Sequence, residues 1–92
     1  MKTKELDREV LIGNMTENLP ILRASLNLTQ EELANKIGVS RATVIAIETK
    51  KRKMTWNTFL SLVLLFIKNE NSNRLLNIME IYTDELNDFI KT

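Results

Sequence analysis

The sequence predicts an all-α protein, a compact bundle of five or six short helices. Two glycines and one proline in 92 residues, with frequent leucine, isoleucine, asparagine and glutamate, leave little room for a sheet. Apolar residues recur at helical spacing, and residues that cap helices precede these runs. A chain of this length buries one modest core, so its helices must pack well or the chain must oligomerise.

The chain divides into three predicted parts. Residues 1–14 are expected to form an N-terminal arm or a short helix. Residues 15–68 contain the main helical domain, whose first helix is expected from Thr16 or Asn18 to Leu26, with Pro20 tolerated in its first turn. Residues 69–92 form a C-terminal helical extension.

The stretch 29–48, TQEELANKIGVSRATVIAIE, predicts two short helices joined by a tight turn. Thr29 can accept a hydrogen bond from a free backbone amide, and Glu32 completes a capping box. Gly38 ends the first helix where a left-handed residue is needed. Ser40 then caps the second helix. Two capped helices around one glycine are typical of a helix-turn-helix.

This region resembles the DNA-binding domain of the lambdoid phage repressor and Cro group. The resemblance begins near Leu19, in LPILRASLNLTQEELANKIGVSRATVIAIE, and runs to about Phe66, in TWNTFLSLVLLF. The resemblance implies a lambda repressor-like fold in which the second helix of the motif reads DNA. The family usually has Asn-Gly where this chain has Thr49 and Lys50, and often a proline where it has Met54.

The remaining helices are predicted from caps and apolar runs. A fourth helix should follow Thr55, and its segment FLSLVLLFI is apolar on almost every side. This run is about half the roughly 20 residues needed to cross a bilayer. Its surplus apolar surface must therefore be covered by residues 72–90, by a second subunit, or by both. A fifth helix is expected after Ser72 and a last one after Thr83.

Charge is distributed unevenly, although the net charge is only +1. Residues 36–53 hold six basic residues and one acid, whereas residues 69–92 hold two basic residues and five acids. A basic segment centred on the helix-turn-helix, with an acidic tail, is the asymmetry of a DNA reader with a separate non-DNA face. The alternative is that the KKRK run at 50–53 is merely a solvated loop.

The second helix of the motif has an inward and an outward side. At 100° per residue, Ser40, Val44 and Ile47 share the inward side. The expected base contacts are the outward residues near its N-terminal end: Arg41, Ala42, Ile45 and Ala46. Arg41 either donates to the O6 and N7 acceptors of guanine or binds a phosphate. Ile45 either meets a thymine methyl or packs at the edge, and the alanines offer only methyl contact or close approach.

Polar and basic residues around that helix are expected to contact phosphates. The predicted set is Thr29, Gln30, Ser40, Thr43, Thr49, Lys50, Lys51, Arg52 and Lys53. Free amides and the helix dipole favour an anion near Gln30. The resemblance implies that this glutamine binds a phosphate and braces the recognition helix. For Thr29 and Ser40 the alternative is helix capping, which does not exclude a phosphate contact.

Two opposite charges are predicted to form a structural ion pair. Arg23 lies within the leucine stripe of the first helix, and Glu48 lies on the inward side of the third. A lone buried charge is costly, so the two should meet. The resemblance implies the same pair. The alternative is two solvated charges at the rim.

The absence of cysteine and histidine removes disulfides, thiolate nucleophiles, zinc-finger ligands and imidazole bases. We therefore expect no enzyme, no metal and no cofactor, and the charged N-terminus argues against a signal peptide and for the cytoplasm. The function indicated is a transcriptional regulator, a repressor that binds a two-fold symmetric double-stranded operator as a homodimer. The alternative is an antitoxin or adaptor that mainly binds another protein.

Overall fold

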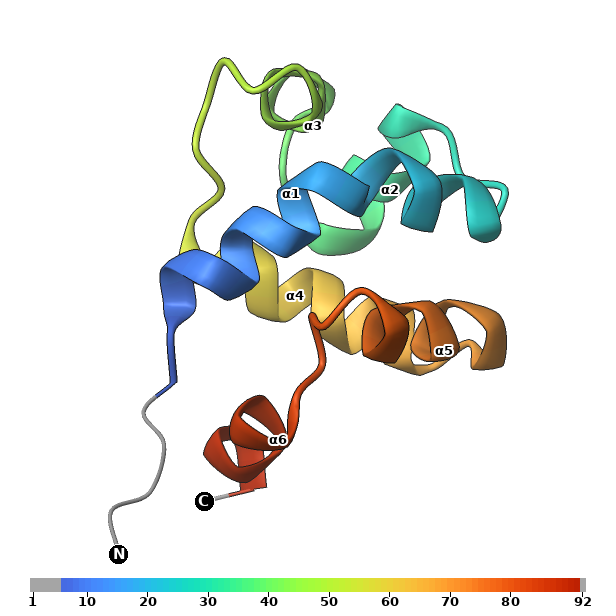
Figure 1. Ribbon diagram of the computed structural model, residues 1–92. Coiled ribbons are helices and arrows are strands. Elements are labelled where there is room, and N and C mark those ends of the chain that lie inside the picture. The colour runs from blue at the N-terminus through green and yellow to red at the C-terminus, as the bar shows by residue number, and fades with distance from the viewer. Residues whose placement is uncertain (1–5, 92) are drawn as a thin grey trace, which may run out of the picture.

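The computed structural model describes residues 6–91, which form six α-helices and no strand. The helices are α1 (Arg8–Ser25), α2 (Gln30–Ile37), α3 (Arg41–Glu48), α4 (Trp56–Ile67), α5 (Glu70–Ile78) and α6 (Asp84–Lys91), shown in Figure 1. The predicted all-α bundle is confirmed. Within the predicted N-terminal arm, residues 1–5 lie outside the described part of the chain.

Helix α1 is longer than the sequence predicts. It begins at Arg8, not at Thr16, because the carboxylate of Asp7 caps it by accepting from the Val10 amide at 3.2 Å. The predicted boundary between residues 14 and 15 falls inside this helix. Pro20 consequently lies in its interior, where it removes the amide that would bond the Thr16 carbonyl. Burial of Leu11, Ile12 and Met15 in the core stabilises the added turns.

Local chemistry sets the bounds of α2 and α3 as predicted. Thr29 and Glu32 form the reciprocal capping box, with oxygen–nitrogen distances of 3.0 and 2.8 Å. The backbone and hydroxyl of Thr29 also lower the pKa of Glu32. Gly38 has φ of 77°, and the Ser40 hydroxyl accepts from the Thr43 amide at the start of α3.

The core lies between α4 and the first three helices. From α4, the side chains Phe59, Leu62, Val63 and Phe66 are buried. They share one apolar cluster with Leu19 and Leu22 of α1, Leu33 and Ala34 of α2, and Val44 and Ile47 of α3. Each helix buries one apolar stripe, so α3 is held by its inner side and its outer side is left open.

Helix α5 also begins earlier than predicted. Its cap is Asn69, whose side-chain oxygen accepts from the amides of Asn71 and Ser72 at 2.9 and 3.3 Å. Ser72 is therefore not the cap. Its hydroxyl is buried and donates to the Phe66 carbonyl at 2.6 Å, which satisfies an acceptor in the last turn of α4.

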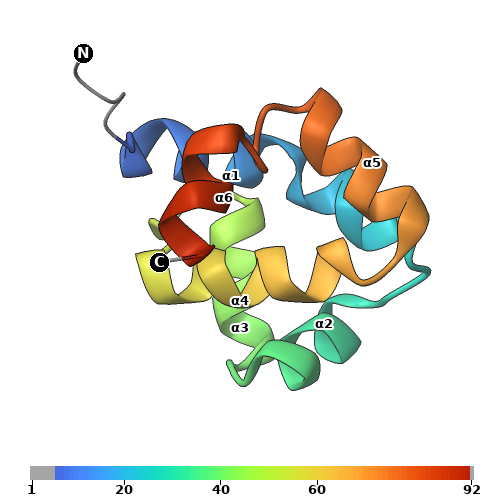
Figure 2. The same ribbon diagram turned by 90° about the horizontal axis from the view of Figure 1, so that it is seen from below.

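The C-terminal extension packs on the rest of the bundle. Thr83 caps α6 as predicted, accepting from the Leu86 amide, and the Leu86 side chain is fully buried. Phe89 meets the edge of Trp56 with ring centroids 6.0 Å apart, and the Arg8 guanidinium lies 4.8 Å from the Trp56 ring centre. Figure 2 shows α6 beside the N-terminal ends of α1 and α4.

Residues of the tail thus cover much of the surplus apolar surface of α4. Leu76, Ile81 and Leu86 join the core cluster, whereas Leu64 on α4 stays 58% exposed. Within residues 6–91, no helix is long and apolar enough to span a bilayer.

Candidate nucleic-acid interface

Helix α3 presents one side to the core and the other to solvent. Val44 and Ile47 are buried in the core cluster, where α3 packs on α1 and α2, and Arg41 and Ala42 at the opposite side are exposed. Ile45 and Ala46 are half-buried, so their outer atoms border the same open surface. The four residues predicted to contact bases therefore reach solvent. Ser40, expected on the inward side, is exposed at the cap.

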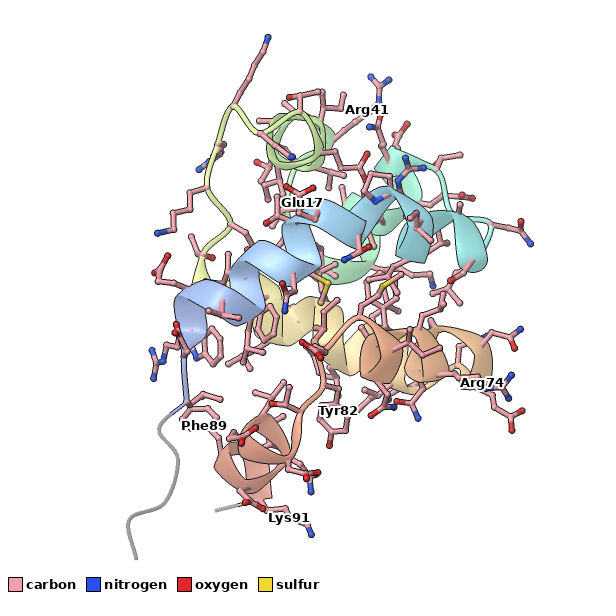
Figure 3. The ribbon with its side chains drawn as sticks, in the orientation of Figure 1. Glu17, Arg41, Arg74, Tyr82, Phe89 and Lys91 are labelled. Carbon is pink, nitrogen blue, oxygen red and sulfur yellow. The ribbon has the colours of Figure 1, made fainter. Side chains whose placement is uncertain are left out.

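Arg41 is the long donor at the start of this surface. Figure 3 shows its side chain extending away from the bundle, at the end of the molecule opposite α6. It borders an open hollow of about 520 Å³ that is also lined by Arg23, Thr29, Gln30 and Glu31. Two guanidinium groups and the first turn of α2 make this hollow attractive to an anion. Glu31 on its rim opposes that attraction and is not among the site residues predicted from the sequence.

The hydroxyl groups of the predicted phosphate set already have intramolecular partners. Those of Thr29 and Ser40 cap α2 and α3. The Thr43 hydroxyl shares a hydrogen bond with Ser40 at 2.9 Å, and that of Thr49 donates to the Ile45 carbonyl at 2.8 Å. These hydrogen bonds hold the hydroxyl of Thr29 at the start of α2 and the other three hydroxyls on α3.

The basic loop after α3 is anchored to α1. Lys50 pairs with Glu17, and Lys53 pairs with Glu9, each at 2.5 Å between nitrogen and oxygen. Arg52 donates weakly to the Thr43 hydroxyl at 3.3 Å. Among the described residues, Lys51 has no side-chain partner. Of the four basic residues 50–53, two are therefore held by ion pairs, Arg52 is held by one weak hydrogen bond, and Lys51 is held by no described side chain.

Lys50 has an unusual backbone conformation. Its φ is 64°, the left-handed region in which the residue after a helix is usually glycine or asparagine. The amides of Lys50 and Lys51 close the end of α3 by donating to the carbonyls of Ile47 and Ala46 at 3.0 and 2.8 Å. Lys50 thus ends α3 as a left-handed residue, although it carries a side chain.

Glu48 at the end of α3 is the centre of a polar cluster. Arg23 donates to it through Nε at 2.8 Å and through Nη2 at 3.1 Å, and the Gln30 amide donates at 2.9 Å. The remaining terminal nitrogen of Arg23 donates to the Leu28 carbonyl at 3.0 Å. The side chain of Glu48 is only 6% exposed and that of Arg23 21%. The hydrogen bonds that Arg23 donates to Glu48 raise the pKa of Arg23, so the guanidinium stays charged.

This cluster joins three helices at the back of the candidate surface. The expected contact between Arg23 and Glu48 is present in the structure, and Gln30 braces the same carboxylate. Because Arg23 lies near the end of α1 and Gln30 begins α2, the end of α3 is tied to both. Groups that sequence reasoning missed are the α1 acids Glu9 and Glu17, whose partners are distant in sequence and carry no local signal.

Comparison with known proteins agrees with this arrangement. Residues 21–55 match the family model described as Helix-turn-helix. Over 37 residues the chain is 60% identical to a protein of Methanocaldococcus jannaschii named as an uncharacterized HTH-type transcriptional regulator, a match that covers 40% of this chain. The matched segment spans 56% of that relative's length. No solved structure matches significantly.

Residues 21–55, from the second half of α1 to the cap of α4, are therefore similar to a helix-turn-helix of this family. The resemblance to the lambdoid repressor and Cro group is confirmed by these matches.

Proposed function

We propose that this protein is a sequence-specific DNA-binding transcriptional regulator that places α3 in the major groove. The observation that supports this most is the combination of a helix-turn-helix with an open outer side of α3 and a basic loop beside it. Helices α5 and α6, which carry several acids, lie below α4 in Figure 1, away from α3 at the top, which keeps their charge away from DNA. Helix-turn-helix proteins dock in this way, with the start of the second helix at the base edges.

Base recognition is assigned to the exposed start of α3. Arg41 points outward with no intramolecular partner among the described residues, and its planar fork suits the two acceptors of guanine. Ala42, Ile45 and Ala46 carry no donors, so they offer methyl contacts to thymine or close approach to the bases. One strong donor per half-site implies modest selectivity.

Phosphate contacts are assigned to both flanks of α3. At one flank, Thr29 and Gln30 line the hollow that Arg41 borders. Ser40 and Thr43 lie at the start of α3, where the Thr43 hydroxyl accepts from Arg52 at 3.3 Å. Thr49 and the basic residues 50–53 follow the end of α3. Contacts of this kind fix the register of a protein on the duplex without reading sequence.

The regulator is proposed to act as a homodimer that represses by covering a promoter. A dimer would read two half-sites about 10 base pairs apart, related by two-fold symmetry. Exposed apolar side chains on neighbouring helices, among them Leu64 on α4 and Ile78 on α5, offer surface that a second copy would cover. Sedimentation equilibrium should give twice the chain mass, and a monomer at concentrations that saturate DNA would contradict the dimer.

A salt titration of DNA binding tests the proposed function. Affinity for a labelled duplex should fall steeply between about 50 and 200 mM salt, as counterions displaced from phosphates are released. Lys51→Gln should make the logarithmic slope shallower by about 0.9. Lys91→Gln is the matched control, since Lys91 lies at the end of the molecule opposite Arg41 (Figure 3) and should leave the slope unchanged. An adaptor or antitoxin that works through a protein partner alone would show little binding at any salt.

A further inference from the structure

Two acids of α1 hold two lysines of the basic loop. Glu9 pairs with Lys53 and Glu17 pairs with Lys50, and the acids lie eight residues apart, on the same side of the helix. Between the pairs, α1 and residues 50–54 enclose a shallow hollow of about 300 Å³. The loop that would approach phosphates is therefore fastened to α1 at both ends.

Both pairs are exposed, which makes them easy to exchange. The four side chains are between 57% and 68% exposed. Ion pairs in such positions gain little from Coulomb attraction in water and lose side-chain entropy. Neither acid has another side-chain partner among the described residues, and lysine has a long flexible stem. A more concentrated negative charge can therefore displace the carboxylates.

The backbone of Lys50 is left-handed, a conformation that glycine adopts without strain. Glu80, which follows the end of α5, shares it with φ of 58°, so this conformation serves to end the helix. The Lys50 side chain reaches back to α1, so in the free protein its charge is paired with Glu17.

We propose that Glu9 and Glu17 compete with DNA phosphates for Lys50 and Lys53. This inference rests on the proposed function and adds a self-inhibiting contact to the same surface. Lys51 and Arg52, which form no ion pair within residues 6–91, make the first contacts with the DNA backbone. Lys50 and Lys53 then exchange a carboxylate for a phosphate. Because phosphates carry no sequence information, the ion pairs of Glu9 and Glu17 with the loop weaken binding to every DNA sequence alike. They also shorten the time that the protein stays on random DNA.

The test compares the parent with the double variant Glu9→Gln, Glu17→Gln on a labelled duplex of random sequence. Removing the competing carboxylates should tighten binding about three- to tenfold at low salt. It should also steepen the dependence of affinity on salt, because the freed lysines neutralise phosphates fully. The matched control is Glu70→Gln with Asp88→Asn, an equal change of charge on exposed residues of α5 and α6.

A cycle with Lys50 separates competition from positioning. Lys50→Gln should cost more affinity when Glu17 is already Gln than in the parent, because only then is the lysine wholly available to DNA. If the two acids instead hold the loop in shape, the double variant will bind more weakly than the parent. Equal or weaker binding would overturn the inference alone. If the parent protein shows no salt-dependent binding to DNA, both the proposed function and this inference are overturned.

Discussion

Glu48 is the residue that fixes the C-terminal end of α3. It accepts three hydrogen bonds, two from Arg23 and one from Gln30, while its side chain is almost wholly buried. A buried carboxylate left without these donors would be strongly unfavourable. The orientation of α3 on the bundle therefore depends on a polar contact as well as on Val44 and Ile47.

Breaking the pair should destabilise the protein clearly. Arg23→Met or Glu48→Leu should each cost about 2–4 kcal/mol of unfolding free energy, somewhat below the value for a fully buried pair, because Arg23 is partly exposed. The double variant should cost less than the sum, since no charge is left alone. Glu17→Gln, which breaks an exposed pair, is the control and should cost less than about 1 kcal/mol. Chemical denaturation gives all four values, and additive effects would show that the two residues act independently.

Arg41 is the residue predicted to contact a guanine base. Arg41→Ala should cost about 1–3 kcal/mol on the best site and relax the preference at one position in each half-site. Lys51→Ala should weaken binding to specific and random DNA by the same factor, since it is expected to touch only phosphate. Fluorescence anisotropy with a specific duplex and a random duplex measures the loss of affinity for each variant and so separates a base contact from a phosphate contact. An equal loss for Arg41→Ala on both would mean that it also binds phosphate only.

At the scale of elements, four caps could be predicted from sequence and two could not. Thr29, Ser40, Thr55 and Thr83 each precede an apolar run, so local chemistry is enough to place them. The start of α1 was missed because glycine and proline inside a helix normally argue against it. Packing of Leu11, Ile12 and Met15 outweighs that local preference.

The start of α5 was ambiguous for a different reason. The segment KNENSN offers several asparagine and serine residues that can cap a helix. Only the tertiary structure selects Asn69, because Ser72 is buried and bonds the Phe66 carbonyl of α4. The ion pairs of Glu9 and Glu17 with the loop escape sequence reasoning in the same way.

The two glycines should respond in opposite directions to the same substitution. A Cβ at either Gly13 or Gly38 would meet nothing within 4 Å. Gly13→Ala in the middle of α1 should stabilise the protein by about 0.5–1 kcal/mol, because alanine favours a helix. Gly38→Ala should destabilise it by about 1 kcal/mol, since φ there is 77°. Thermal unfolding measures both, and a loss of stability on Gly13→Ala would contradict the placement of Gly13 within α1.

The packing of α6 rests chiefly on one buried side chain. Leu86→Ala should cost about 2–5 kcal/mol because Leu86 is fully buried. Ile90→Ala on the same helix is the control, and its 49% exposure predicts a change below about 1 kcal/mol. If the two variants unfold at the same denaturant concentration as the parent, α6 does not pack on the bundle in solution.

For the whole molecule, charge and shape divide the bundle into two ends. Arg41 and the basic loop lie with α3 at one end, and α6 with its acids lies at the other (Figure 3). The sequence predicts this division because basic and acidic residues fall in separate segments. It could not predict that α1 would bring two acids to the basic end, since that depends on how a long helix crosses the loop.

Selection of bound duplexes from a pool of random sequences tests the central claim most directly, that α3 reads DNA through Arg41. We expect enrichment of a two-fold symmetric site whose half-sites lie about 10 base pairs apart and each contain a required guanine. The Arg41→Ala protein should select the same spacing without that guanine. A pool that stays random after repeated selection with the parent protein would contradict the claim.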